Sequence, residues 1–144
     1  MILEFMRDDH RLCDEVYSEA ENALSANDHE KASALFDQFY QMTNHHFDME
    51  ERELFIAFEK RTGMMGGPTQ MMRYEHQQLR SLLESMKSAL SEKRTNDFFG
   101  IGESMMIMLQ QHNMKEEQML YPMIDRALGT DGELMIQTLK EMAQ

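Results

Sequence analysis

The stretch NHHFDMEERELF (44–55) has His46 four residues before Glu50. The stretch QQHNMKEEQMLY (110–121), 66 residues further on, has His112 four residues before Glu116. Residues four apart on an α-helix share one face and lie one turn apart. Each pair can therefore direct an imidazole and a carboxylate toward a single point, and the chain contains this arrangement twice.

The repetition extends beyond these two stretches. The aligned pairs at the same offset are His10 with His76, Asp9 with Glu75, Glu50-Glu51 with Glu116-Glu117, and Leu54-Phe55 with Leu120-Tyr121. In both halves 36 residues separate the two histidines. We interpret the chain as two copies of one unit, each a pair of helices.

Apolar residues and histidines recur at steps of three and four in four segments, which is typical of helices with one buried face. The faces comprise Met6, His10, Cys13, Tyr17, Ala20 and Leu24; Ala32, Leu35, Phe39, Met42, His46 and Glu50; Met72, His76, Leu79, Leu83, Met86 and Leu90; and Met105, Met108 or Leu109, His112, Glu116 and Met119 or Leu120. Short breaks at 25–28, 61–68 and 91–97 carry Gly, Pro and helix-capping residues.

Helices joined by short loops run antiparallel, so we predict an all-α fold, an up-down-up-down four-helix bundle over residues 1–128. A short amphipathic fifth helix is expected within 129–144, with Leu134, Met135, Leu139 and Met142 on its apolar side. Gly100 and Gly102 weaken the start of the fourth helix by about 1 kcal/mol each relative to Ala. Pro122 is expected to kink that helix or end it early.

The helix lengths predict that the six polar residues lie at one depth of the bundle. At a rise of roughly 1.5 Å per residue, antiparallel neighbours bring their histidines level to within about one turn, provided the fourth helix includes both glycines. The residues that meet are then His10, His46, Glu50, His76, His112 and Glu116.

A pair of buried carboxylates would repel each other and lose hydration, and four imidazoles beside them also need partners. Metal ions satisfy the whole set, with ligands directed inward from facing helices. Six ligands exceed the needs of one tetrahedral zinc site and suit two ions that share two bridging carboxylates. Iron is the first choice and manganese the second.

Composition narrows the class of protein. The chain has 14 Lys and Arg against 26 Asp and Glu, a net charge of −12. This excess argues against nucleic acid or an anionic membrane as partner, because both favour basic patches. The single Cys13 excludes an internal disulfide, and no apolar run approaches the length of a membrane span. We expect a soluble, cytoplasmic protein.

The order of these six residues resembles the hemerythrin-like proteins, also called the HHE cation-binding domain. The resemblance covers residues 1 to about 128. It implies a non-haem di-iron centre with an oxo or hydroxo bridge, in which Glu50 and Glu116 bridge the ions. His10 and His46 would then hold one iron, and His76 and His112 the other.

Two departures separate this chain from the oxygen carriers of that family. Arg80 stands where those proteins have a fifth histidine, and Glu116 follows its histidine by four residues where they have an Asp five residues on. The four-histidine, two-glutamate form is more similar to bacterial iron–sulfur repair proteins and to the eukaryotic iron-sensing hemerythrin domain.

Three functions are open on these grounds. The first is a metal protein that binds or senses O₂, NO, peroxide, iron or redox state. The second is a di-iron enzyme that decomposes peroxide or NO or assists iron–sulfur repair, and the third is a metal-free helical interaction module.

Two neighbouring features complete the expected site. Asp14, four residues after His10, is a candidate to ligate or orient that histidine. The segment KEEQ (115–118) beyond Glu116 is expected to be solvated surface. The oligomeric state stays open.

Overall fold

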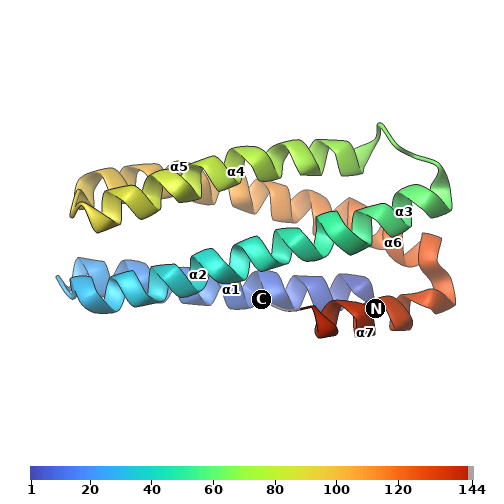
Figure 1. Ribbon diagram of the computed structural model, residues 1–144, viewed down its shortest axis with the longest axis horizontal. Helices are drawn as coiled ribbons and strands as arrows, with labels where there is room; N and C mark the ends of the chain where they lie inside the picture. The colour runs from blue at the N-terminus through green and yellow to red at the C-terminus, as the bar shows by residue number, and fades with distance from the viewer. Residues whose placement is uncertain (143–144) are drawn as a thin grey trace.

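Two helical hairpins lie side by side in the structure, a computed structural model that describes residues 1–142 of the 144-residue chain (Figure 1). The helices are α1 (Ile2–Ser25), α2 (His29–Met49), α3 (Phe55–Thr62), α4 (Pro68–Ser91), α5 (Thr95–Lys115), α6 (Tyr121–Leu128) and α7 (Gly132–Glu141). A π-helical turn at Glu50–Leu54 joins α2 to α3 without a break, and a second at Glu116–Leu120 joins α5 to α6.

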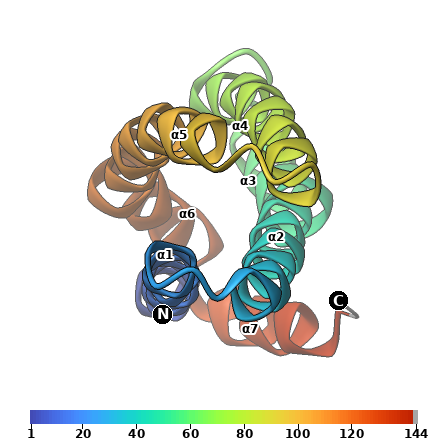
Figure 2. The ribbon, with the colours of Figure 1, turned by 90° about the vertical axis from the view of Figure 1, so that its left-hand side faces the viewer.

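The four long rods run up and down, which confirms the predicted bundle. In the end-on view, α1 lies beside α2, and α4 beside α5 (Figure 2). Within residues 1–142, no helix is both long enough and apolar enough to cross a membrane.

The hairpin turns repeat as closely as the helices. Asn27 and Lys93, which are 66 residues apart, both adopt the left-handed conformation, with φ of 61° and 59°. After the first turn, the side chain of Asp28 accepts a hydrogen bond from the backbone N–H of Lys31 and caps α2. Each half therefore reverses direction by the same backbone device, and this keeps its two histidines at matching depth.

Both glycines of the fourth rod lie inside α5, as expected. A Cβ atom at Gly102 would lie 2.3 Å from the hydroxyl of Tyr17, so the glycine makes room for that ring. The equivalent residues of the other half are Phe36 for Gly102 and Leu83 for Tyr17. At both pairs of positions the larger residue belongs to the first half and the smaller one to the second half, and Tyr17 fills the space beside Gly102.

The expectation that Pro122 would end the helix early is wrong, and a kink there stays a prediction. Helix α6 continues to Leu128, with Pro122 directly after the π-helical turn at Glu116–Leu120. The first half has the same π-helical turn, although Ile56 takes the place of the proline. The turn is therefore a property of the repeat and is not caused by Pro122.

The fifth helix is α7, which follows a 3₁₀ turn at Gly129–Asp131 and packs against α1 (Figure 1). Leu139 is buried and Met135 is partly buried on its inner side. Leu134, expected on the apolar side, is 71% exposed, so its assignment to the buried face is wrong. The proposed boundary at residue 128 stays a prediction.

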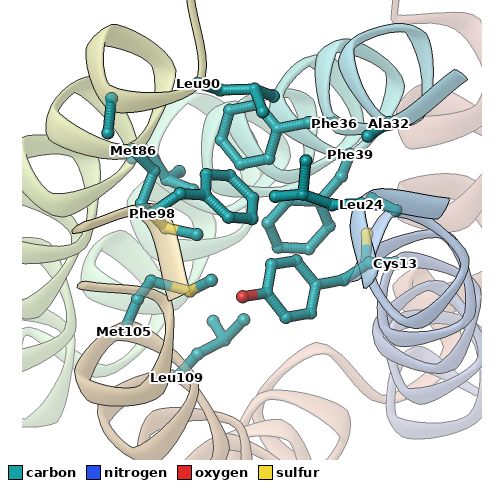
Figure 3. Packing of buried hydrophobic residues seen from close by; sticks show 14 of the residues in the cluster. Cys13, Leu24, Ala32, Phe36, Phe39, Met86, Leu90, Phe98, Met105 and Leu109 are labelled. Atoms are coloured by element: carbon teal, nitrogen blue, oxygen red, sulfur yellow. The ribbon is translucent and has the colours of Figure 1, made fainter. Parts of the chain in front are cut away.

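Two apolar clusters fill the bundle, one toward each end. The first surrounds the rings of Phe36, Phe39 and Phe98 near the hairpin turns (Figure 3). The second includes Leu54, Phe55 and further residues at the opposite end. The predicted polar residues occupy the layer between the clusters, so apolar side chains separate them from solvent along the bundle axis.

Candidate metal centre

Each glutamate of the centre begins a π-helical turn. The N–H of Phe55 donates to the carbonyl of Glu50, five residues earlier, and the N–H of Tyr121 donates to the carbonyl of Glu116 in the same way. The wider turn changes which residues face inward beyond the glutamate. Leu120 is 2% exposed and Met119 is 54% exposed, which decides between the two expected core positions. π-Turns inside α-helices are frequent at functional sites.

The structure brings all six predicted residues together in one buried layer. None is more than 5% exposed: His10, His46, Glu50, His76, His112 and Glu116. The Nε2 atoms of His76 and His112 are 3.2 Å apart. Donor atoms within 4.8 Å of one another form two groups, one from Glu50, His76, His112 and Glu116 and the other from His10, His46 and Glu116. Glu116 belongs to both.

The carboxylates of this layer have oxygen atoms that lack hydrogen bonds. Oε1 of Glu50 lies 3.0 Å from Nε2 of His76, and Oε2 of Glu116 lies 3.3 Å from Nε2 of His112. Neither oxygen has a hydrogen bond of acceptable geometry to any described residue. Buried polar atoms are nearly always paired, so these two require an explanation. Carboxylate oxygens and imidazole nitrogens facing a common point fit a divalent or trivalent transition metal.

A carboxylate on the outer side holds each of the four imidazole rings. The contacts from Nδ1 are His10 to Glu117 at 2.8 Å, His46 to Asp9 at 2.7 Å, His76 to Glu51 at 2.6 Å and His112 to Glu75 at 2.7 Å. A hydrogen bond donated by Nδ1 leaves the lone pair of Nε2 free to bind a metal and fixes the orientation of the ring. The four acids are themselves two aligned pairs of the repeat.

The spacing of the six central residues does not by itself mark these outer carboxylates as part of the site. Their signal was present in the alignment of Asp9 with Glu75 and of Glu51 with Glu117. The interpretation of KEEQ as ordinary solvated surface is wrong for Glu117, which contacts His10. Lys115 is 42% exposed and donates to Glu75 at 2.6 Å.

Asp14 and Arg80 lie near the central residues, and each has a partner that the sequence did not predict. Asp14 accepts a hydrogen bond from Gln110 at 3.1 Å, and His10 is oriented by Glu117 instead. Arg80 donates to Glu51 at 2.8 Å. The arginine at the fifth-histidine position therefore supports the carboxylate that orients His76.

Tyr121 is the main residue of the centre that the sequence analysis missed. Its hydroxyl lies 2.6 Å from Oε2 of Glu50 and 2.9 Å from Oε1 of Glu116. The same oxygen is 3.2 Å from Nε2 of His46 and 3.3 Å from Nε2 of His10. A hydroxyl has one proton to donate, so two short carboxylate contacts require a second proton on one of the acids.

The protonation of the metal-free site follows from burial and neighbouring charge. Burial and the Glu116 carboxylate raise the pKa of Glu50. Burial also opposes ionisation of Glu116, but His112, Glu50 and His10 outweigh it and hold its pKa well below the usual range. Burial opposes a charge on His10, yet the Glu116 carboxylate raises its pKa to about 9. In the metal-free site, bound protons balance the charges of the buried carboxylates, and a bound cation would replace those protons.

Comparison with known proteins agrees with this geometry. The sequence profile of the hemerythrin HHE cation binding domain matches residues 1–135. An uncharacterized hemerythrin-like protein of Schizosaccharomyces pombe is 29% identical over 127 residues, which are 88% of this chain and 60% of that protein. No solved structure matches the chain significantly.

A helical bundle with a buried layer of histidines and glutamates is the architecture of a cation-binding domain. The chain belongs to the hemerythrin HHE cation-binding domain family, whose profile spans nearly all of it. It covers 60% of the length of the yeast relative, so the activity of that whole protein does not transfer directly to this chain.

Proposed function

We propose that the chain binds two iron ions in the layer between its two apolar clusters, with manganese as the second choice. His10 and His46 would hold one ion, and His76 and His112 the other. Glu50 and Glu116 would bridge them, with an oxo or hydroxo group completing the pair. The unpaired carboxylate oxygens that face the Nε2 atoms carry this proposal.

The outer carboxylates favour a metal centre over a buried polar network. Every Nδ1 is anchored to an acid on the outer side. Every Nε2 lies in the shared layer, where its hydrogen-bond contacts are with the Tyr121 hydroxyl or another imidazole. A metal ion would replace these contacts at Nε2 and leave the contacts at Nδ1 in place. Four imidazoles and two carboxylates suit iron, which accepts nitrogen and oxygen ligands and coordination numbers above four.

We infer further that the centre binds or senses a small ligand such as O₂, NO or peroxide, or reports iron or redox state. Bound iron would supply redox chemistry and open coordination positions. The chain itself would exclude bulk water, since the apolar clusters flank the layer on both sides. The outer acids would hold the imidazoles in their binding orientation. Cytoplasmic location stays a prediction from composition.

Metal analysis of protein purified with and without oxygen tests the proposal. We expect about two iron ions per chain after reconstitution. Absorption spectra before and after addition of azide or NO then test for an oxo-bridged ferric pair with accessible positions. Less than about one iron or manganese per chain would contradict the proposal. It would favour the metal-free interaction module.

Peroxide or NO turnover at the same centre is the enzymatic alternative. His76→Ala removes one proposed ligand, so it should abolish any turnover that depends on the metal pair. Equal rates for the variant and the wild type would dismiss this alternative.

A further inference from the structure

A groove of about 690 Å³ opens between α1 and α5, in the part of the bundle nearer the hairpin turns. Three carboxylates line it, from Asp14, Glu21 and Glu103, and its described lining includes no Lys, Arg or His. Met106 and Ile107 are among the apolar residues of its wall. The groove therefore combines negative charge with an apolar surface, and none of the candidate metal ligands lines it.

The hydroxyl of Tyr17 lies at the floor of this groove without a hydrogen bond. Tyr17 is 2% exposed and lines the groove together with Gly102. No side chain separates the hydroxyl oxygen from the groove at the glycine, where an added Cβ would lie 2.3 Å from that oxygen. The hydroxyl has no hydrogen-bond partner of acceptable geometry within residues 1–142. Buried polar atoms are nearly always paired, so a polar group that enters the groove is the expected partner.

The equivalent groove of the other half already contains an ammonium group. It lies between α2 and α4, on the opposite side of the bundle (Figure 2). Lys87, the repeat partner of Glu21, lines it together with Asp37, the repeat partner of Glu103. The Nζ atom of Lys87 lies 4.6 Å from the ring centroid of Tyr40, which also lines this groove. The second half thus supplies its own cation at the position where the first half has a carboxylate.

The two grooves differ in space as well as in charge. Phe36, the repeat partner of Gly102, lines the groove between α2 and α4, whose volume is about 140 Å³. Arg80 is the repeat partner of Asp14, so two basic residues of the second half are acids in the first. The first half therefore lacks both the cation and the aromatic ring that occupy the equivalent groove.

We propose that the groove between α1 and α5 binds an aliphatic diamine in its doubly protonated form, with one ammonium beside Glu21 and Tyr17 and the other beside Asp14. The first ammonium takes the place that Lys87 holds in the other half. It donates hydrogen bonds to the carboxylate and to the unpaired hydroxyl oxygen, because an ammonium has three donors and no acceptor. The methylene chain covers the apolar wall at Met106. This site is separate from the proposed metal centre and does not depend on it.

The spacing of the acids favours an extended cation over a metal ion. Asp14 and Glu21 are seven residues apart on α1, which is about 10 Å at the rise of a helix. Among residues 1–142, the groups of three or more possible ligand atoms within 4.8 Å of one another include none of the groove's acids. One ion cannot join carboxylates that far apart, whereas an alkyl chain with an ammonium at each end can reach both.

Isothermal titration of the metal-free full chain with 1,6-diaminohexane tests the proposal. We expect saturable binding of one diamine per chain at about 0.15 M salt. The monoamine 1-aminohexane should bind about tenfold more weakly, because it lacks one of the two ammonium groups and their charged hydrogen bonds. The uncharged 1,6-hexanediol has the same chain length and should show no saturable binding.

Variants of the groove locate the binding site. Glu21→Lys copies Lys87 and puts an ammonium into the groove, so the affinity for the diamine should fall at least about a hundredfold through repulsion between like charges. Glu21→Gln is the milder change and should weaken binding about tenfold, and Tyr17→Phe about fivefold. Glu19→Lys is the matched control. Glu19 is exposed and does not line the groove, so the same change of charge there should alter the affinity by less than about twofold.

Three results would overturn the diamine site. The first is absence of saturable binding by the wild-type protein. The second is an equal affinity of Glu21→Lys, Glu21→Gln and the wild type, with thermal unfolding of each variant showing that it is folded. The third is displacement of the diamine by an equal concentration of Mg²⁺, since the groove would then be a general acidic surface. Because the titration uses metal-free protein, failure of the proposed iron centre would leave this result unchanged.

Discussion

The two halves of the bundle hold the same candidate ligands in different surroundings. Around His10 and His46 lie the hydroxyl of Tyr121, the Cys13 thiol and the polar groups of Thr43 and Asn113. The repeat partners of these four residues are Phe55, Leu79, Leu109 and Phe47, and the rings of Phe47 and Phe55 stack on His76. The repeat thus preserves the residues that would bind metal and diverges in the residues beside them.

The two halves also differ in the residues that hydrogen-bond to the outer carboxylates. Glu51 receives a hydrogen bond from Arg80, and the repeat partner of that arginine is Asp14. Asp14 accepts a hydrogen bond from Gln110, and Glu117 contacts His10. The ring of His76 is therefore held by a longer chain of hydrogen bonds than the ring of His10.

The largest effect should come from Glu116, because it belongs to both groups of donor atoms. Glu116→Gln should reduce iron content from about two ions per chain to nearly none, whereas His46→Ala and His112→Ala should each leave about one. Metal analysis of the three variants measures this. Loss of a single ion from Glu116→Gln would show that the two halves bind metal independently.

The outer carboxylates should have the next largest effect. Removing such a group lowers metal affinity by roughly 10–100-fold, and we expect losses in this range for Glu51→Gln and Glu117→Gln. Glu51→Gln should be the more severe, because it also removes the partner of Arg80. Competition with a chelator measures both. Asp14→Asn is the control, and a loss of affinity there would place Asp14 among the groups that support His10.

Tyr121 should matter most when the metal is absent. Tyr121→Phe copies the residue of the first half and leaves two buried carboxylates without their shared hydroxyl. We expect the metal-free protein to lose about 1–3 kcal/mol of unfolding free energy. The loss should shrink when iron binds the carboxylates. Denaturant unfolding with and without iron makes the comparison, and equal losses in both states would contradict it.

The last prediction concerns the packing of Tyr17 against Gly102 across the two halves. Gly102→Ala adds a Cβ 2.3 Å from the Tyr17 hydroxyl, and overpacking of this kind costs about 1–3 kcal/mol. Gly100→Ala is the matched control, since no described atom beyond its own helix backbone and chain neighbours lies within 4 Å of its added Cβ. That change should stabilise α5 by up to about 1 kcal/mol. Thermal unfolding of both variants measures the difference, and stabilisation by Gly102→Ala would show that Tyr17 moves freely.

The sequence by itself determined the bundle and the membership of the buried histidine and glutamate layer. Helical spacing defined the inward faces of the helices. The repeat of 66 residues gave the helices of the two halves matching lengths, so the four histidines had to lie at similar depth: His10, His46, His76 and His112. These are local properties, because the period of a helix and the length of a rod do not depend on the partner against which it packs.

Only the tertiary structure decided what surrounds those candidate ligands. The π-helical turn at Glu116–Leu120 directs Tyr121 inward. A regular period of 3.6 residues per turn does not predict this change of register. The pairing of each imidazole with an acid on another helix, and the unpaired hydroxyl of Thr43, depend on how four rods meet. Hydrogen bonds between helices depend on distances between atoms far apart in the chain, and a pattern read along one helix does not contain them.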